Sequence, residues 1–150
     1  MKFAHNIQIR VFCREEENPE KVLEGLHKLV PFNFEEEKIL LKKTNASEFK
    51  EKSIAIFEVV LEKEKHTAKF IQHLIASLSQ EQKNYLERQI TSRLDKELNF
   101  FLRIDKQILL DENRYFITDR GNCYHIRISV AAFPSKYEKA VEVVKMMLEI

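Results

Sequence analysis

The sequence contains very few of the residues that build flexible or specialised loops. Among its 150 residues there are only two glycines and three prolines, and tryptophan is absent. Flexible linkers and glycine-rich phosphate loops depend on repeated glycine, so both are excluded. The motifs GxxxxGKS/T, GxSxG, HExxH and CxxC are also missing. The sequence therefore carries no signature of a nucleotide hydrolase, a serine esterase or a zinc site.

Long apolar runs and clusters of metal-ligand residues are missing as well. No segment approaches the roughly 20 apolar residues that cross a bilayer, and the N-terminus lacks the apolar core of a signal peptide. Cys13 and Cys123 have opposite parity in their strand patterns, so we expect two unpaired thiols. The histidines show no metal-ligand spacing shared with cysteine. We therefore predict a cytoplasmic protein with no membrane contact, no metal and no cofactor.

The chain has almost no net charge. Its 25 Lys and Arg residues stand against 24 Asp and Glu residues, which leaves +1. A basic surface must therefore come from segregation of charge between faces, because the composition does not supply one. With 44% hydrophobic residues the chain can bury a core, and its length fits one domain over residues 1–150.

Apolar periodicity predicts strands and helices in a mixed order. Alternation with period two predicts strands over residues 5–14, 37–44, 53–63, 100–107 and 124–134, with a short additional strand at 114–118. Helical spacing predicts helices over residues 19–30 and 66–79, a long helix from Ser79 through Leu98, and a last helix from Ser135. Asn18 before Pro19 is a typical helix cap, and capping boxes are predicted at Ser79 and Ser135. Turns are expected at residues 45–47 and 119–122.

This order defines the fold class. Strands and helices do not alternate strictly, which argues against a doubly wound parallel sheet. The order β-α-β-β-α-α-β-β-α instead predicts an α+β fold with a mostly antiparallel sheet of about five or six strands and helices packed on one face. The other face should be partly open, as is usual for antiparallel sheets.

Two strand segments near the C-terminus display arginine opposite an apolar face. Side chains change face at every residue of a strand. In residues 100–107, Phe101 and Arg103 lie opposite the apolar set, and in residues 124–134, His125 and Arg127 do the same. An arginine in the middle of a strand is not needed for folding. It indicates either an anionic partner or a solvated surface.

Residues of the N-terminal strand can join the same displayed face. Arginine contacts phosphates and stacks on bases, and phenylalanine offers a stacking platform for unpaired bases. Proteins that read RNA on a sheet face use this combination. The predicted nucleic-acid-binding residues are Arg10, Phe12, Phe101, Arg103, His125 and Arg127, with Gln8 beside them and Lys38 and Lys42 as an extension. No catalytic residue is predicted.

Other interpretations of these residues remain open. A helix could cover this face too, which would bury Phe12 and Phe101 in a core and pair the arginines with carboxylates. A structural module could use the sheet edge or face to form a homodimer. A small-molecule enzyme could use His125 together with Asp105. Finally, the helix pair around residues 77–79 could imitate a DNA-reading helix-turn-helix, although acidic residues share the exposed surface of its second helix.

The two C-terminal strand segments resemble an archaeal protein family described as RNA-binding and as a predicted exosome subunit. In that family a strand of the form FFLR-x-DKQ precedes a hairpin and a strand that begins HVRI and ends AAYP. Residues 100–107 and 125–134 match these motifs, with Ile104 where phenylalanine is common and Phe133 where tyrosine is common. The resemblance extends more loosely to the N-terminal strand and to the order of elements.

The resemblance implies an α+β fold related to a 5S-rRNA-binding ribosomal protein. It also implies RNA as a partner, together with exosome or ribosome-associated proteins, and it brings no catalytic residue. We therefore expect a non-catalytic RNA-binding protein of the archaeal cytoplasm that is linked to RNA processing or decay.

Overall fold

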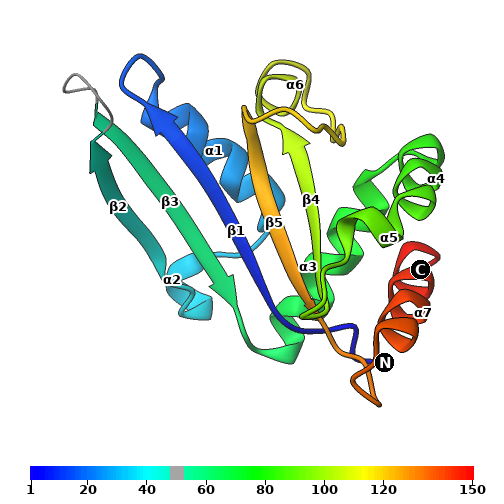
Figure 1. The fold of residues 1–150 in the computed structure, drawn as a ribbon. Helices are drawn as coiled ribbons and strands as arrows, with labels where there is room; N and C mark the ends of the chain where they lie inside the picture. Colours follow the sequence, from blue (N-terminus) through cyan, green and yellow to red (C-terminus); the bar gives the residue numbers. More distant parts are fainter. Residues whose placement is uncertain (48–52) are drawn as a thin grey trace.

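The chain folds into a five-stranded antiparallel sheet with strand order β2-β3-β1-β5-β4 (Figure 1). This architecture comes from a computed structural model that describes residues 1–47 and 53–150. The strands are β1 (Ala4–Arg14), β2 (Leu41–Ser47), β3 (Ser53–Leu61), β4 (Asn99–Asp105) and β5 (Cys123–Val130). The predicted α+β class and the antiparallel sheet are confirmed.

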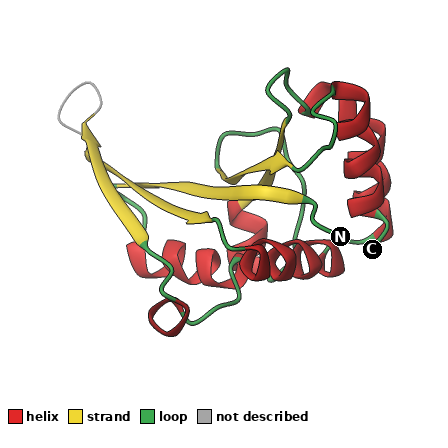
Figure 2. Cartoon of the chain, turned by 90° about the horizontal axis from the view of Figure 1, so that it is seen from below, coloured by secondary structure: helices red, strands yellow, loops and turns green. Residues whose placement is uncertain are grey.

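The helices gather in two places. The helices are α1 (Pro19–Leu29), α2 (Phe34–Glu37), α3 (Glu64–Ser77), α4 (Gln80–Arg88), α5 (Ile90–Arg93), α6 (Lys106–Glu112) and α7 (Tyr137–Leu148). The long helices α1 and α3 lie along one face of the sheet, whereas α4, α5 and α7 stand beyond the β4 edge (Figure 1). Figure 2 shows that the helices at the right extend past the sheet on the side that α1 and α3 leave uncovered. They form a wall along one side of this uncovered face.

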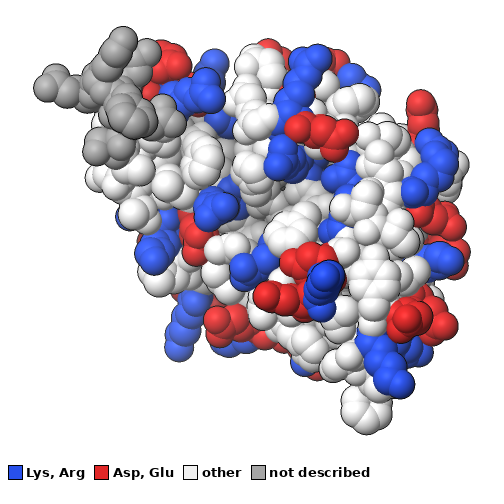
Figure 3. Space-filling model, in the orientation of Figure 1, with Lys and Arg blue, Asp and Glu red and all other residues white. Residues whose placement is uncertain are grey.

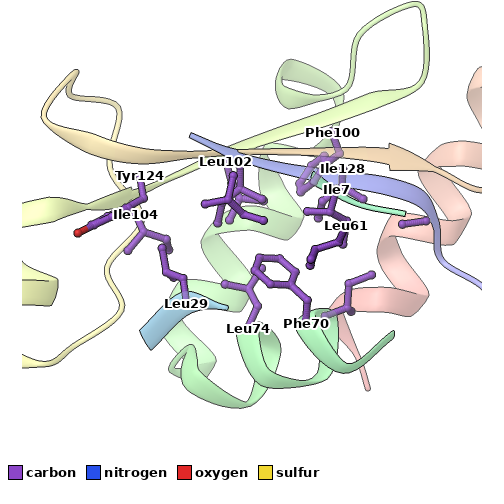
Figure 4. Close-up of a cluster of buried hydrophobic side chains, with 14 of the residues drawn as sticks. Ile7, Leu29, Leu61, Phe70, Leu74, Phe100, Leu102, Ile104, Tyr124 and Ile128 are labelled. Carbon is purple, nitrogen blue, oxygen red and sulfur yellow. The ribbon is translucent and has the colours of Figure 1, made fainter. Parts of the chain in front are cut away.

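The core lies between the sheet and the helices α1 and α3. Alternate residues of β1, β4 and β5 are buried, as the alternation predicts. In Figure 4, side chains from the strands point down onto side chains from the two helices. The labelled strand residues are Ile7, Leu61, Phe100, Leu102, Ile104, Tyr124 and Ile128, and the helix residues are Leu29, Phe70 and Leu74. Burial of these side chains is the main stabilising contribution to the fold.

The predicted helix caps at Asn18 and Ser79 are confirmed, but the reciprocal half of the predicted box at Ser79 is not formed, because Gln82 Oε1 accepts from the Ile117 amide instead. Asn18 Oδ1 accepts a hydrogen bond from the Glu20 amide at 2.9 Å, with Pro19 as the first helical residue. Ser79 Oγ accepts from the amide of Gln82 at 3.1 Å. The predicted box at Ser135 is wrong, because α7 begins only at Tyr137 and the Ser135 hydroxyl donates to the Ala132 carbonyl instead.

Around β2 the predicted boundaries shift. Residues 34–37 form α2, because Asn33 Oδ1 accepts from the Glu36 amide at 3.1 Å, and Lys38 ends this helix with a left-handed φ of 56°. The strand predicted at 37–44 therefore begins only at Leu41. The turn predicted at residues 45–47 is wrong, because these residues continue β2 and pair with β3.

Near the C-terminal strands a short helix replaces predicted strand. Asp105 Oδ1 accepts from the Ile108 amide at 2.9 Å, so β4 stops at Asp105 and α6 starts at Lys106. The strand predicted at 114–118 is reduced to an isolated bridge between Ile104 and Ile117. Residues 131–134, predicted as strand, follow the end of β5 at Val130.

The long helix predicted after Ser79 is divided. It ends at Arg88, and α5 adds only one further turn before the chain enters β4. Leu98 adopts a left-handed φ of 64° at the tight turn into that strand. Leu86, Ile90 and Leu94 recur every fourth residue and are all buried, although the helix itself is interrupted after Arg88.

Gly25 is required by the closest contact between α1 and the sheet. The hydroxyl of the fully buried Tyr124 donates to the Val22 carbonyl at 2.7 Å, and burial raises the pKa of that phenol. A methyl group at residue 25 would overlap this hydroxyl, come within 2.7 Å of Tyr124 Cζ, and lie 2.9 Å from Leu110 Cδ2. Glycine therefore allows α1 to sit this close to β5.

We expect Gly25→Ala to lower the free energy of unfolding by about 1–3 kcal/mol, as overpacking does, despite the better helix propensity of alanine. Urea denaturation measures the change. The double variant Gly25→Ala with Tyr124→Phe removes the clashing hydroxyl and should recover part of the loss. Equal stability of wild type and Gly25→Ala would show that the contact is not tight.

Candidate nucleic-acid interface

The register of the three strands β1, β5 and β4 brings the predicted site residues together. Arg10 lies opposite His125, which lies opposite Arg103 on the next strand. In the neighbouring row Gln8 lies opposite Arg127, which lies opposite Phe101. Phe12 follows on β1, with its ring 5.9 Å from that of His125. The face shared by these side chains is called the arginine face below.

The arginine face is open. Phe12 is 37% exposed and Phe101 is 43% exposed, whereas their strand neighbours Val11 and Leu102 are buried. The helices α1 and α3 cover the opposite side of the sheet. The interpretation in which a helix also covers this face, with both phenylalanines in a core, is therefore wrong.

The arginines of this face form no ion pair among the described residues, although Glu58 of β3 lies opposite Arg10. The ion pairs within residues 1–47 and 53–150 involve neither Arg10, Arg103 nor Arg127. Arg103 Nη1 donates to the Asp119 carbonyl at 3.0 Å, and Arg10 lies 5.8 Å from the centre of the Phe12 ring. The buried Nε of Arg127 has no hydrogen-bond partner. A buried donor left unpaired is costly, and it is the group that an anionic ligand would satisfy.

A hollow of about 320 Å³ lies between these side chains. It is lined by Gln8, Arg10, Phe101, Leu102, Arg103, His125, Ile126 and Arg127. Figure 3 shows blue Lys and Arg side chains around a hollow over the middle of the sheet. The protein is nearly neutral as a whole, but positive side chains are concentrated around this hollow, as expected if charge is segregated between faces.

His125 sits between two arginines at the centre of this face. Burial lowers its pKa below the usual 6.5, and the positive charges of Arg103 and Arg10 lower it further. The imidazole is therefore neutral at pH 7 in the folded protein. A neutral ring can stack on its neighbours and can act as a hydrogen-bond acceptor as well as a donor.

We expect the His125 ring to titrate below pH 6.5 in an NMR titration of the folded protein. A histidine with a lowered native pKa contributes stability above its unfolded pKa, and this contribution is lost as the pH falls through the native value. His125→Gln should therefore lose less stability than wild type between pH 7 and pH 5. A midpoint at or above 6.5 would contradict the placement of the ring between the two arginines.

The remaining candidates do not line this hollow. Lys38 lies outside the sheet and does not extend the arginine face. Lys42 does lie on the same face, separated from Arg10 by Glu58, which is opposite both residues. Both lysines line a separate hollow at the β2 edge. Asp105 caps α6 and does not line the hollow that contains His125, so the pairing of these two in an enzyme site is not seen. Gln82 of α4 accepts from the Ile117 amide at 2.6 Å, so a side chain that the helix-turn-helix interpretation needs free is engaged.

The sequence did not predict that α4 and α5 form a wall along one side of the arginine face. Arg93 Nη2 lies 3.0 Å from Asp119 Oδ1, and the Tyr85 hydroxyl donates to Asp119 Oδ2 at 3.3 Å. The Asp119 backbone carbonyl in turn accepts from Arg103. This network links α4 and α5 to the loop before β5. Arg93 reads as an ordinary surface residue of a helix, and no local pattern signals a contact 26 residues away.

Comparison with known proteins assigns the chain to a family. A family model described as RNA binding matches residues 6–131. RNA-binding protein PAB1135 of Pyrococcus abyssi is 32% identical over 147 residues, which cover 97% of this chain and 94% of that protein. The chain belongs to this RNA-binding family.

Solved archaeal structures share the fold. The protein Mth689 of Methanothermobacter thermautotrophicus, a DUF54 protein, superimposes with a TM-score of 0.77 at 27% identity and covers 97% of this chain and 98% of its own. The protein AF2318 of Archaeoglobus fulgidus gives a TM-score of 0.84 at 22% identity, with 96% and 99% covered. In the described residues no helix is long and apolar enough to cross a membrane, and no group of three or more His, Cys, Asp or Glu side chains is placed to hold a metal ion.

Proposed function

We propose that this protein binds RNA on its arginine face and does so without catalysis. Arg10, Arg103 and Arg127 contact phosphates, Phe12 and Phe101 stack on bases, and His125 contributes a hydrogen bond or a stacking surface. Membership of the RNA-binding family and the name of the Pyrococcus abyssi relative support RNA as the ligand. The location of the site is our inference from the geometry.

The main support for this location is that the arginines of the face form no ion pairs in the described structure. Arginines on a solvated protein surface commonly pair with neighbouring carboxylates, and this chain has 24 of them. Around the hollow, however, Arg103 donates to a backbone carbonyl and Arg127 Nε donates to nothing in the described structure. Phosphate oxygens supply the acceptors that these guanidinium groups lack.

The double variant Arg103→Ala with Arg127→Ala tests the site. We expect at least a tenfold loss of affinity for a mixed-sequence single-stranded RNA in fluorescence anisotropy. Each phosphate contact on a single strand contributes about −0.7 to the slope of log K against log salt, so the slope should become shallower by about 1.4. A folded hairpin RNA is measured beside the single strand.

The matched control removes two positive charges from the helix side of the sheet. Lys21 of α1 and Lys69 of α3 are exposed and lie on helices that cover the opposite face. Lys21→Ala with Lys69→Ala should leave affinity within about twofold of wild type. If both double variants lose the same affinity, binding reflects net charge and the assignment to the arginine face is wrong.

The family resemblance adds one narrower expectation to this proposal, which is a place in archaeal RNA processing or decay, beside exosome or ribosome-associated proteins. The alternative function is a homodimer that buries the same face, and sedimentation analysis separates it. A stable dimer that excludes RNA and dissociates on Phe101→Glu would replace RNA binding as the role of this surface.

A further inference from the structure

Three hollows adjoin one another on and beside the arginine face. The middle one is the 320 Å³ hollow over β1, β5 and β4. The second, of about 520 Å³, lies between β4 and α5 and is lined by Gln89, Ser92, Arg93, Leu94, Asp95, Phe101, Arg103 and Asp119. The third, of about 540 Å³, lies at the C-terminal end of β1 and reaches β3; it is lined by Phe12, Arg14, Ala46, Ile54, Ile56, Arg103, Gly121, Asn122 and His125.

Shared residues connect the three hollows. Phe101 and Arg103 line both the middle and the α5-side hollow, and Arg103 and His125 line both the middle and the β3-side hollow. The Phe101 and His125 rings therefore lie at the two boundaries of the middle hollow, and Arg103 lines all three hollows. The Asp119 carbonyl holds the Arg103 guanidinium at 3.0 Å, which fixes this side chain between the hollows.

The three hollows differ in chemistry. The middle hollow is cationic, with Arg10, Arg103 and Arg127 around it and no carboxylate in its lining. The β3-side hollow carries the apolar side chains Phe12, Ile54 and Ile56. The α5-side hollow combines the Phe101 ring with Arg93 and the carboxylates of Asp95 and Asp119. It also contains the polar groups of Gln89 and Ser92, which suit the edge of a base or a ribose hydroxyl.

We infer that the arginine face binds an unpaired dinucleotide step of single-stranded RNA. The linking phosphate occupies the middle hollow among the three arginines, and its oxygens accept from the guanidinium groups that line it. One flanking base lies on Phe12 in the β3-side hollow, and the other lies against Phe101 in the α5-side hollow. This inference rests on the proposed RNA-binding function and specifies its ligand.

The three hollows together extend over at least four strands of the sheet. Four strands, from β4 across β5 and β1 to β3, span three steps of about 4.8 Å each. A sheet of four strands holds two or three stacked bases in known RNA readers. A duplex keeps its bases paired and stacked inside the helix, so it cannot place one base in each outer hollow while a phosphate enters the middle one.

The test compares a ten-nucleotide single strand with the same strand in a duplex, by fluorescence anisotropy on the full chain. We expect the single strand to bind at least tenfold more tightly. Phe12→Ala and Phe101→Ala should each weaken single-strand binding about five- to a hundredfold, as loss of one stacked base does, without changing the salt slope. Arg127→Ala should weaken binding and make the salt slope shallower by about 0.7.

Phe133→Ala is the matched control, because Phe133 is 92% exposed and lines none of the three hollows. It should bind like wild type, and urea denaturation should show that the variants fold. Equal affinity for strand and duplex, with unaffected phenylalanine variants and weakened arginine variants, would overturn the dinucleotide site but leave RNA binding on this face intact. Failure of wild type to bind either RNA would overturn the proposed function itself.

Discussion

The register of β1 between β3 and β5 is the constraint on which both the core and the arginine face depend. Side chains alternate along β1, so Ile7 and Ile9 point into the core while Gln8 and Arg10 point to the opposite face. The strand is paired on both sides, with β3 and with β5. A slip by one residue would bury Arg10 and expose Ile9. The apolar side of β1 therefore fixes the position of its functional side, and the two cannot change independently.

Lys106 supports the end of β1 that carries Phe12. Its ammonium donates to the Phe12 carbonyl at 2.7 Å and to both Glu17 oxygens at 3.1 Å, and its side chain is only 4% exposed. A buried ammonium group needs such a partner, because its loss of hydration is otherwise strongly destabilising. This lysine is a positive charge near the face that is already neutralised by Glu17. It contributes to the position of Phe12, while the unpaired arginines remain for a ligand.

The sequence predicts which residues lie on the arginine face but not which helices surround it. Alternation in two motif-bearing segments places Arg103 and Arg127 opposite an apolar side, and the structure confirms that parity. Whether the face is open depends on where α1 and α3 pack, which is decided by contacts between distant residues. The wall was missed for the same reason, because Arg93 meets Asp119 only through the tertiary fold. Asp105 shows a local failure: its side chain caps α6, and alternation alone does not separate a strand end from a helix start.

The small net charge bears on how such a face recognises its ligand. With a formal charge of +1, the whole molecule produces little long-range attraction for a polyanion, and surface charges more than about 10 Å apart are screened at ordinary salt. Recognition at the proposed site therefore has to depend on short-range contacts, between the arginines and phosphate and between the exposed rings and bases. Proteins that bind duplex nucleic acid nonspecifically take most of their affinity from many phosphate contacts. A near-neutral protein with three unpaired arginines between aromatic rings is better suited to a short, unpaired segment, because stacking adds affinity that does not depend on charge.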